Sequence, residues 1–244
     1  RMNGLLAAAL ALREQENLTA EEQATIIKWA GMALYKLGIA MNSLMPDGTS
    51  QEGMAYWEYG AEFIIKAGES ARTALGIDMF KMTEVYKNSG SYILYNLLPG
   101  GRGVLNIGDA NTHYPSAWAL RWIAAEYGDA NAQWLANQLG GDNWISLILA
   151  DTTLAPVAPQ LDETLHWFKD MDHVIARSDW SGNEDLLSIK CGVPCGLNLM
   201  QLVQRGLYPG EADAGHAHPD ANHITLNKNA IPNDPQKPAV TSGV

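Results

Sequence analysis

The sequence predicts an α+β protein in which a mainly helical part is followed by a part built from antiparallel strands. From Met2 to about Ala150, runs rich in alanine and leucine carry apolar residues three and four apart, a spacing typical of amphipathic helices. After Asp151 the runs become alternating or β-branched, and eight of the eleven prolines follow this point. Helices first and strands second favour two segregated layers or domains over a βαβ array. We therefore expect a helical domain over residues 1–155 and a strand domain over residues 165–244.

The helices are predicted from their spacing and from cap and turn signals. The second helix opens with Thr19 followed by Glu22, a capping box in which side chains and backbone N–H groups satisfy one another. It ends before the Pro-Asp-Gly turn at residues 46–48. Short loops predict antiparallel neighbours stacked in pairs. The predicted helices cover residues 3–15, 20–45, 54–75, 82–98, 117–127, 130–139 and 144–149.

The strands are predicted after a proline-containing linker over residues 155–164. Two alternating or β-branched runs, HVIARSDW at 173–180 and DLLSIKCG at 185–192, are joined by SGNE, which is typical of a hairpin turn. A further strand is expected at HITL, residues 223–226.

Composition and charge exclude several classes of function. With 47% hydrophobic and 18% charged residues among 244, the chain is expected to fold. Its net charge of −11 argues against nucleic-acid binding, which requires a basic surface. No apolar run has the length of a membrane span, and no glycine-rich nucleotide-binding motif is present. Cys191 and Cys195 are too few for a disulfide framework or a complete zinc site; two free thiols or one small-loop disulfide both stay open.

The densest group of chemically active side chains lies in GHAHPDANHITL, residues 215–226. It contains three of the six histidines, His216, His218 and His223, together with Asp220. Pro219 disfavours a helical conformation at His218, so His216 and His218 project from one face of an extended segment. Imidazole moves a proton near neutral pH and also binds metals. The pattern favours a functional site over a polar loop whose histidines satisfy one another.

A second candidate is the loop PDGTSQEGMAYWEYG, residues 46–60, at the entrance of a helix. Tyr56 and Tyr59 are three apart and share roughly one helix face. A tyrosine acts as a general acid or base when its surroundings lower its pKa. Trp57 offers a flat apolar face for a sugar ring. The alternative is that the aromatic residues only pack. The loop gathers Asp47, Glu52, Tyr56, Trp57, Glu58 and Tyr59.

Two further places carry weaker signals. Asp109 and His113, in NIGDANTHY, are typical of a loop stabilised by Asx turns. Arg177, in ARSDW, is able to bind a carboxylate through two hydrogen bonds. A strand-end salt bridge between Arg177 and Asp179 is an equally good interpretation.

Four stretches together resemble the heparinase II/III-like polysaccharide lyases, a family that includes oligoalginate lyases. They are NGLLAAALAL, PDGTSQEGMAYWEYG, HVIARSDWSGNEDLLSIKCG and GHAHPDANHITL, in this order and over nearly the whole chain. The motifs D-G-x-x-x-E-G-x-x-Y and H-x-H-x-D are more specific together than either is alone. The resemblance implies a helical (α/α) toroid followed by an antiparallel β-sandwich. Residues 1–155 would be part of the toroid, and residues 165–244 the beginning of the sandwich.

The resemblance implies cleavage of a uronic-acid-containing polysaccharide by β-elimination. In that reaction the carboxylate beside C5 is neutralised, a base removes the C5 proton, and an acid protonates the leaving glycosidic oxygen. Tyr56, with Tyr59 as the second choice, and His216 match the proton-transfer groups. The candidate substrate-binding residues are Trp57, Glu52, Arg177 and His223.

The resemblance also implies a structural zinc site. His218 matches a position that binds zinc in some members, and Asp234 matches a second ligand sixteen residues further on. A third ligand is expected beyond Val244 and the carboxylate-neutralising Asn or His before Arg1, so we expect a piece of a longer protein with an incomplete zinc site. A periplasmic or secreted location and an acidic polysaccharide or oligosaccharide as partner are expected on the same basis.

Two other functions stay open. A glycoside hydrolase on an α/α toroid would use two carboxylates, such as Glu52 and Asp109. A non-catalytic glycan-binding protein would keep the fold alone. The net charge repels a polyanion at long range, but salt screens this beyond about 8–10 Å. A local basic cleft of Arg102, Arg177, Lys190 and Arg205 would suffice if these side chains converge.

Overall fold

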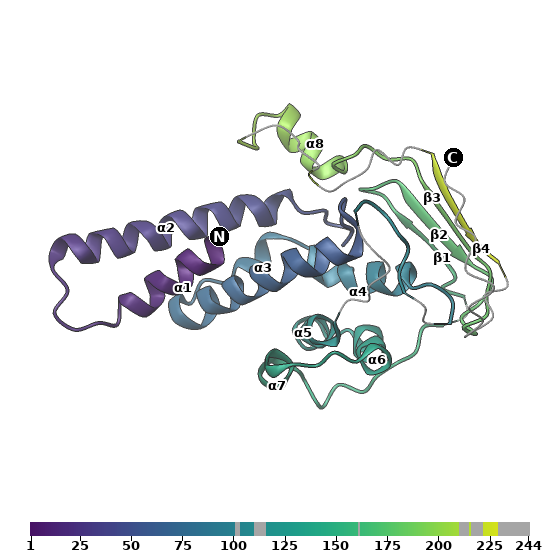
Figure 1. Ribbon diagram of the computed structural model, residues 1–244, viewed down its shortest axis with the longest axis horizontal. Helices are drawn as coiled ribbons and strands as arrows, with labels where there is room; N and C mark the ends of the chain where they lie inside the picture. Colours follow the sequence, from purple (N-terminus) through teal and green to yellow (C-terminus); the bar gives the residue numbers. More distant parts are fainter. Residues whose placement is uncertain (101–102, 110–115, 161, 210–214, 216–221, 229–244) are drawn as a thin grey trace. The chain divides into compact units, whose positions relative to one another are not determined.

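The computed structural model describes residues 1–100, 103–109, 116–160, 162–209, 215 and 222–228. Helices α1 to α7 come first along the chain and the strands follow, as the composition predicts, with helix α8 between β3 and β4, so the fold is of the mixed α+β type (Figure 1). The elements are α1 (Met2–Leu12), α2 (Ala20–Ser43), α3 (Gly53–Leu75), the 3-10 helix η1 (Met79–Met82), α4 (Val85–Asn96), α5 (Ala117–Tyr127), α6 (Ala130–Leu139), α7 (Trp144–Leu149), β1 (Leu165–Phe168), β2 (His173–Arg177), β3 (Leu186–Lys190), α8 (Leu197–Gln204) and β4 (His223–Asn227).

The described chain forms two compact units, and helix α3 runs through both. Unit 1 contains residues 1–44 and 59–83, and unit 2 contains residues 45–58 and everything from residue 84 onward. The predicted domains, 1–155 and 165–244, separate the helices from the strands along the sequence. The two compact units instead divide the chain within the helical part, at residues 44/45, 58/59 and 83/84. The predicted domains therefore stay a prediction.

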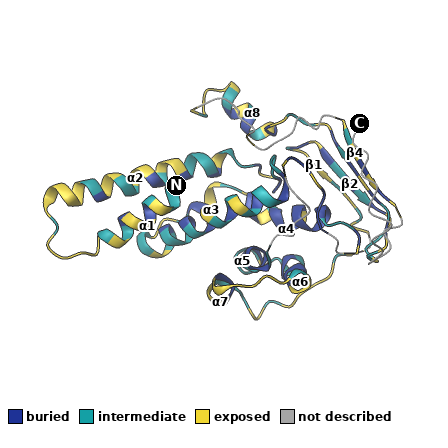
Figure 2. Cartoon of the chain, viewed as in Figure 1, coloured by how far each residue is buried: buried dark blue, intermediate teal, exposed yellow. Residues whose placement is uncertain are grey.

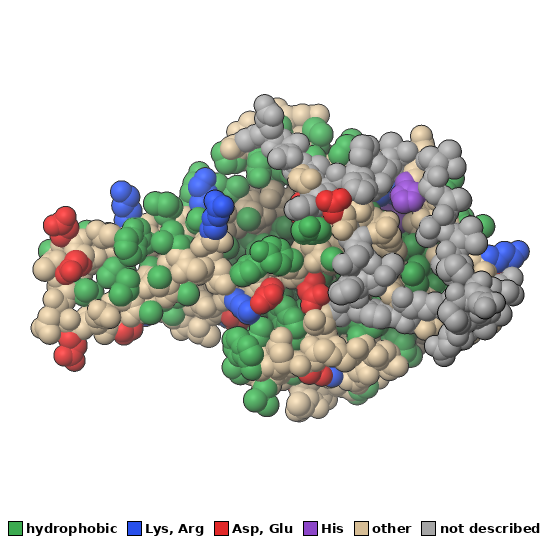
Figure 3. Space-filling model, in the orientation of Figure 1, with side chains coloured by type: hydrophobic (Ala, Val, Ile, Leu, Met, Phe, Trp, Pro, Cys, Tyr) green, Lys and Arg blue, Asp and Glu red, His purple; other side chains and the backbone are tan. Residues whose placement is uncertain are grey.

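Unit 1 consists of the helical hairpin α1–α2, the larger part of α3 and the whole of η1. Thr19 accepts a hydrogen bond from the backbone of Glu22, whose carboxylate accepts one from Thr19 N–H at 2.8 Å, which confirms the predicted capping box. Leu6, Ala33 and Leu37 form part of its core. Acidic side chains gather at the turn between α1 and α2 (Figure 3).

Helix α4 lies at the centre of the helical part of unit 2. Nine of its twelve residues are buried, so most of it is dark blue in Figure 2. Tyr86 of α4 meets Trp122 of α5 edge to face, with ring centroids 5.5 Å apart. Tyr92 makes the same kind of contact with Phe168 of β1 at 5.4 Å. Aromatic side chains therefore join α4 both to its neighbouring helices and to the sheet.

The four strands form one antiparallel sheet in the order β1-β2-β3-β4 (Figure 1). The register aligns His173 of β2, Lys190 of β3 and His223 of β4 across three strands. This face of the sheet is mostly buried, while Leu187, Ile224 and Leu226 on the other face are 37–45% exposed. A β-sandwich needs a second sheet against such an apolar face, and the described residues contain one sheet.

The structure differs from the predicted elements in several places, among them the end of the first helix, which is at Leu12 and not at residue 15. The fourth helix begins at Val85 and not at residue 82, because η1 occupies Met79–Met82. Strand β1 and helix α8 were missed. Strand β1 has only four residues, too few for a recognisable alternation, and it is a strand because it pairs with β2. Helix α8 has only eight residues and begins directly after Gly196. In the described residues, no helix is long and apolar enough to cross a membrane.

Candidate functional site

The loop that precedes α3, residues 46–52, is held against α4 by its backbone. Asn88 Nδ2 donates to the carbonyl of Pro46 at 2.6 Å, and the Tyr92 hydroxyl donates to the carbonyl of Ser50 at 3.3 Å. Gly48 has a φ of +87°, and its Cβ position lies 2.4 Å from the backbone carbon of Asn88. Only glycine satisfies both the backbone angle and the close approach. The loop thus has one defined conformation at the entrance of α3.

Asp47 organises the loop and ties it to the turn between β1 and β2. Its Oδ1 accepts hydrogen bonds from the backbone and hydroxyl of Thr49, at 3.2 and 2.6 Å. Its Oδ2 accepts from the backbone N–H of Asp170 at 2.7 Å, and Asp170 Oδ2 accepts from the backbone N–H of Asp47 at 3.2 Å. Burial, and then the charge of Asp47, raises the pKa of Asp170. Sequence reasoning missed Asp170, because its partner is 123 positions away.

Glu52 is the last residue of this loop, and Tyr56, four positions later, lies in the first turn of α3. Both side chains are half-buried. The Cβ position of Gly215 lies 3.0 Å from Glu52 Oε1. Gly215 directly precedes His216 in the sequence. The structure therefore brings the beginning of the histidine stretch beside the carboxylate that lies one helical turn before Tyr56.

Trp57 is not a sugar-stacking platform. The structure buries it to 6% exposure, and its indole N–H donates to the Ser89 hydroxyl of α4 at 3.1 Å. The prediction of an open aromatic face at this position is therefore wrong, because the indole is part of the core that holds α3 against α4. Glu58, one residue on, accepts from the backbone N–H of Ser116, the residue before α5, at 2.9 Å.

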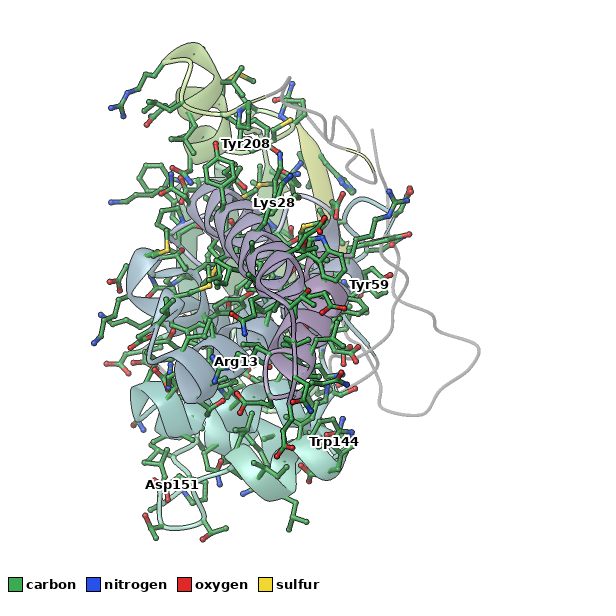
Figure 4. The ribbon with its side chains drawn as sticks, turned by 90° about the vertical axis from the view of Figure 1, so that its left-hand side faces the viewer. Arg13, Lys28, Tyr59, Trp144, Asp151 and Tyr208 are labelled. Atoms are coloured by element: carbon green, nitrogen blue, oxygen red, sulfur yellow. The ribbon has the colours of Figure 1, made fainter. Side chains whose placement is uncertain are left out.

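Tyr59, the second choice for the proton-transfer tyrosine, lies in unit 1. Its side chain is 62% exposed at the molecular surface (Figure 4). Its ring meets that of Phe63 edge to face at 5.0 Å. The half-buried Tyr56 and the exposed Tyr59 thus have different surroundings although they lie on one helix.

Arg177 does not offer its guanidinium to a ligand, and its predicted salt bridge with Asp179 is wrong. Its side chain is 1% exposed and pairs with Glu184 at 2.5 Å. It also donates to the backbone carbonyls of Tyr95, at 3.0 Å, and of Leu97. Asp179, two residues on in the sequence, is not the partner, because the turn between β2 and β3 brings Glu184, just before β3, to Arg177. The pair docks the hairpin onto the end of α4.

A cavity of about 550 Å³ lies beside this ion pair. It is lined by side chains from α4, α6 and the β2–β3 hairpin, among them Trp134, Gln138 and Trp180. Arg177 Nε and Glu184 Oε2 are buried and have no hydrogen-bond partner among the described residues. The guanidinium lies 4.4 Å from the centre of the Trp180 ring.

The buried face of the sheet holds a row of basic side chains. His173 is 1% exposed, and its Nε2 lies 2.7 Å from the Ser188 hydroxyl. Burial, Lys190 and His223, in that order, lower the pKa of His173 to about 3. His223, a predicted substrate-binding residue, is half-buried at the start of β4, with its Nε2 3.4 Å from the Thr225 hydroxyl.

The predicted basic cleft does not form from the residues named for it. Lys190 is 1% exposed and Arg177 is buried, so neither faces solvent in a cleft. Arg205 is exposed at the end of α8. Arg102 lies outside the described residues.

Several predicted site residues also lie outside the described part of the chain. They are His113, His216, His218, Asp220 and Asp234. The zinc site assigned to His218 and Asp234, and the assignment of Tyr56 and His216 as proton-transfer groups, therefore stay predictions. Within the described ranges, no group of three or more His, Cys, Asp or Glu side chains has the arrangement of a metal site. Cys191 and Cys195 are free thiols.

No family model matches the chain. Serine hydroxymethyltransferase of Chromohalobacter salexigens is 56% identical over 50 residues, which are 20% of this chain and 11% of that enzyme. The enzyme of the same name from Nitrosomonas europaea is 52% identical over 50 residues, again 11% of its length. The chain thus spans about a ninth of the length of these curated relatives, and a match of this extent shows no family.

The crystal structure of heparinase III is similar to almost the whole chain. The TM-score is 0.64 with 15% sequence identity, and the match covers 94% of this chain and 32% of heparinase III. The chain therefore spans about a third of the length of that protein. A likeness at this identity concerns the fold alone, so the chain has a heparinase-like fold of mixed helices and antiparallel strands.

Proposed function

We propose that this chain is part of a polysaccharide lyase that cleaves a uronic-acid-containing polysaccharide by β-elimination. The fold likeness to heparinase III supports the class of protein. The observation that carries the proposal is the position of Gly215 against Glu52, one helical turn before Tyr56. Glu52 and Gly215, about 160 residues apart in the sequence, each belong to one of the two stretches chosen for their chemistry, and their close approach supports a common site.

Tyr56 and His216 would act as the proton-transfer groups. A phenol hydroxyl protonates the leaving glycosidic oxygen, and an imidazole or phenolate removes the C5 proton once the neighbouring carboxylate is neutralised. The hydrogen-bonded loop of residues 46–52 and the Trp57–Ser89 contact hold the first turn of α3 in place. Such fixed placement of a catalytic group is one of the larger contributions to enzymatic rate.

Ultraviolet absorbance of the unsaturated uronate tests the proposal. The chain is incubated with alginate, heparan sulfate, hyaluronan and an ulvan-type polysaccharide, and absorbance and reducing ends are measured together. We expect both to rise in parallel with one or more of these polysaccharides. Tyr56→Phe should lower the rate by about 100-fold or more, since it removes one proton-transfer group. Tyr35→Phe, which makes the same change at an exposed tyrosine of α2, serves as the control and should retain the rate.

Reducing ends without new absorbance would reject the lyase and favour a hydrolase that uses carboxylates such as Glu52 and Asp109. Binding of the polysaccharide with neither product would favour a non-catalytic glycan-binding protein. The match to serine hydroxymethyltransferases covers too little of those enzymes to carry an active site. A periplasmic or secreted location and a structural zinc held by His218 and Asp234 belong to the same proposal.

A further inference from the structure

One carboxylate joins three segments of unit 2 that are distant in the sequence. Asp170 lies in the turn between β1 and β2, and its Oδ2 accepts the backbone N–H of Asp47 at 3.2 Å. Its carboxylate also accepts a hydrogen bond from the backbone N–H of Asn198, in the first turn of α8. The backbone carbonyl of Asp170 accepts from Leu197 N–H at 2.8 Å. The loop before α3 and the beginning of α8 therefore share one anchor.

The joined segments also contact each other directly. Gly196, just before α8, has a φ of +75°, and its Cβ position lies 2.8 Å from Cε and Sδ of Met45. Met45 precedes the Pro-Asp-Gly turn. A side chain at residue 196 would displace Met45, so α8 begins directly against the loop that Asp47 organises.

Each of the two segments leads to one of the candidate proton-transfer groups. Tyr56 follows Asp47 by nine residues, through a loop whose backbone is held by α4. His216 follows the last residue of α8, Gln204, by twelve residues. Of the two candidate groups, Tyr56 is the one that lies within the described residues, so the loop before α3 is the segment whose position bears directly on a candidate group.

We propose that Asp170 is a positioning residue: it holds the tyrosine-bearing loop against the turn between β1 and β2 and the start of α8, so that Tyr56 is fixed in place to transfer a proton to the sugar substrate. The inference rests on the proposed lyase function. Asp170 contacts backbone N–H groups of Asp47 and Asn198, and its own N–H is held by the Asp47 carboxylate. Its effect on the reaction is therefore indirect, through the geometry of the two segments.

Hydrogen–deuterium exchange of the whole chain tests the bridge without reference to activity. Asp170→Ala removes both carboxylate acceptors, so amides in residues 45–52 and in residues 196–204 should exchange about 10-fold faster or more. Amides of α5 and α6 should be unaffected. Asp170→Asn keeps one side-chain oxygen that is able to accept a backbone hydrogen bond, so its exchange rates in these two segments should lie between those of the wild type and Asp170→Ala.

Asp179→Ala is the matched control, because it removes a carboxylate from the other hairpin turn of the sheet. Asp179 accepts from Ser181 N–H at 2.7 Å, within its own turn. Its loss should alter exchange around residues 178–185 only. Unchanged exchange in either 45–52 or 196–204 of Asp170→Ala would show that Asp170 does not bridge the two segments. If Asp170→Ala does not fold, Asp170→Ser, whose hydroxyl is too short to cap two amides, replaces it.

Kinetics on the polysaccharide that the wild type cleaves test the positioning role. Asp170→Ala should lower kcat by about 100-fold with KM changed less than about 3-fold, as expected when a reacting group is displaced by about 1 Å. Asp170→Asn should recover much of kcat and keep the wild-type pH profile. Faster exchange with an unchanged kcat would overturn the positioning role. A wild type that cleaves no polysaccharide rejects the proposed function, and the exchange experiment then decides on the bridge alone.

Discussion

At the scale of single residues, Asp47 and Arg177 each join segments of unit 2 through hydrogen bonds or ion pairs. The Asp47 carboxylate accepts hydrogen bonds from the backbone N–H groups of Thr49 and Asp170. Arg177 pairs with Glu184 and donates to the backbone carbonyls of Tyr95, in α4, and of Leu97, just after it. Buried polar groups without a partner destabilise a fold by about 1–3 kcal/mol each. These contacts therefore specify where the loop, the hairpin and α4 meet, and they leave Arg177 no role as a free ligand-binding cation.

The ionisation of His173 couples pH to stability. Its pKa is lowered to about 3 by burial, by Lys190 on β3 and by His223 on β4. An unfolded histidine has a pKa of about 6.5. Between these two values the unfolded chain binds the additional proton, so stability falls as the pH decreases. The full contribution of neutral His173 is present above about pH 6.5.

We predict that His173→Gln flattens the acid side of the stability profile. Glutamine retains a hydrogen-bonding side chain toward Ser188 but does not titrate. The wild type should lose about 1.4 kcal/mol of unfolding free energy per pH unit on this account between about pH 6 and 5, and the variant should lose much less. Urea denaturation at each pH gives the free energy of unfolding.

His166→Gln provides the comparison for that series. The pKa of His166 is lowered by burial as well, but the side chain is only half-buried, so its removal should change the slope less. Equal slopes for wild type and His173→Gln would show that His173 is protonated in the folded state or that its site opens before it titrates.

At the scale of elements, local sequence signals and tertiary contacts determined different features. The capping box of α2 and the limits of α5, α6 and α7 follow from short-range patterns, and the structure confirms them. Strand β1 and helix α8 are short, and they are stabilised by partners far away: β2 for the strand, and Asp170 and Met45 for the start of the helix. Short elements of this kind carry too few residues for a periodic pattern.

Gly48 offers a test of how strongly the loop before α3 is specified. Gly48→Ala places a Cβ atom 2.4 Å from the backbone of Asn88, at a φ of +87°. Gly76→Ala has a comparable φ of +69° with nothing within 4 Å, so it isolates the cost of the backbone angle. We expect about 1–2 kcal/mol of destabilisation at Gly76, and about 1–3 kcal/mol more at Gly48. Urea denaturation of both variants measures the difference.

Gly48→Ala should also lower any lyase activity of the chain, because the loop leads into the turn of α3 that carries Tyr56. Gly76→Ala, at the end of α3, should leave kcat unchanged. Equal destabilisation by the two substitutions would mean that the loop shifts away from α4 at little cost.

At the scale of the whole molecule, the net charge of −11 opposes a polyanionic substrate. The basic residues that were expected to form a local cleft do not do so: Arg177 and Lys190 are buried in the protein. Long-range repulsion is therefore expected to slow the encounter with an acidic polysaccharide, and added salt relieves it.

We predict that kcat/KM for an acidic polysaccharide rises with ionic strength at the low end. The Debye length shortens from about 30 Å at 0.01 M to about 10 Å at 0.1 M, so kcat/KM should increase by a factor of about 2 to 10 over this range. A short oligosaccharide with one uronate should show a smaller rise. A decrease with salt would instead reveal a local basic binding surface that outweighs the net charge.

The sequence by itself determined the order of helices and strands, most helix limits, the α2 cap and the two stretches richest in candidate chemistry. Those features depend on spacing, caps and turn residues within about ten positions of one another. Only the tertiary structure decided that Trp57 and Arg177 are core residues, that Glu184 and not Asp179 pairs with Arg177, and that Asp170 anchors the loop and α8. Burial and pairing depend on contacts between segments more than a hundred residues apart, such as the 123 positions between Asp47 and Asp170, which no local pattern records.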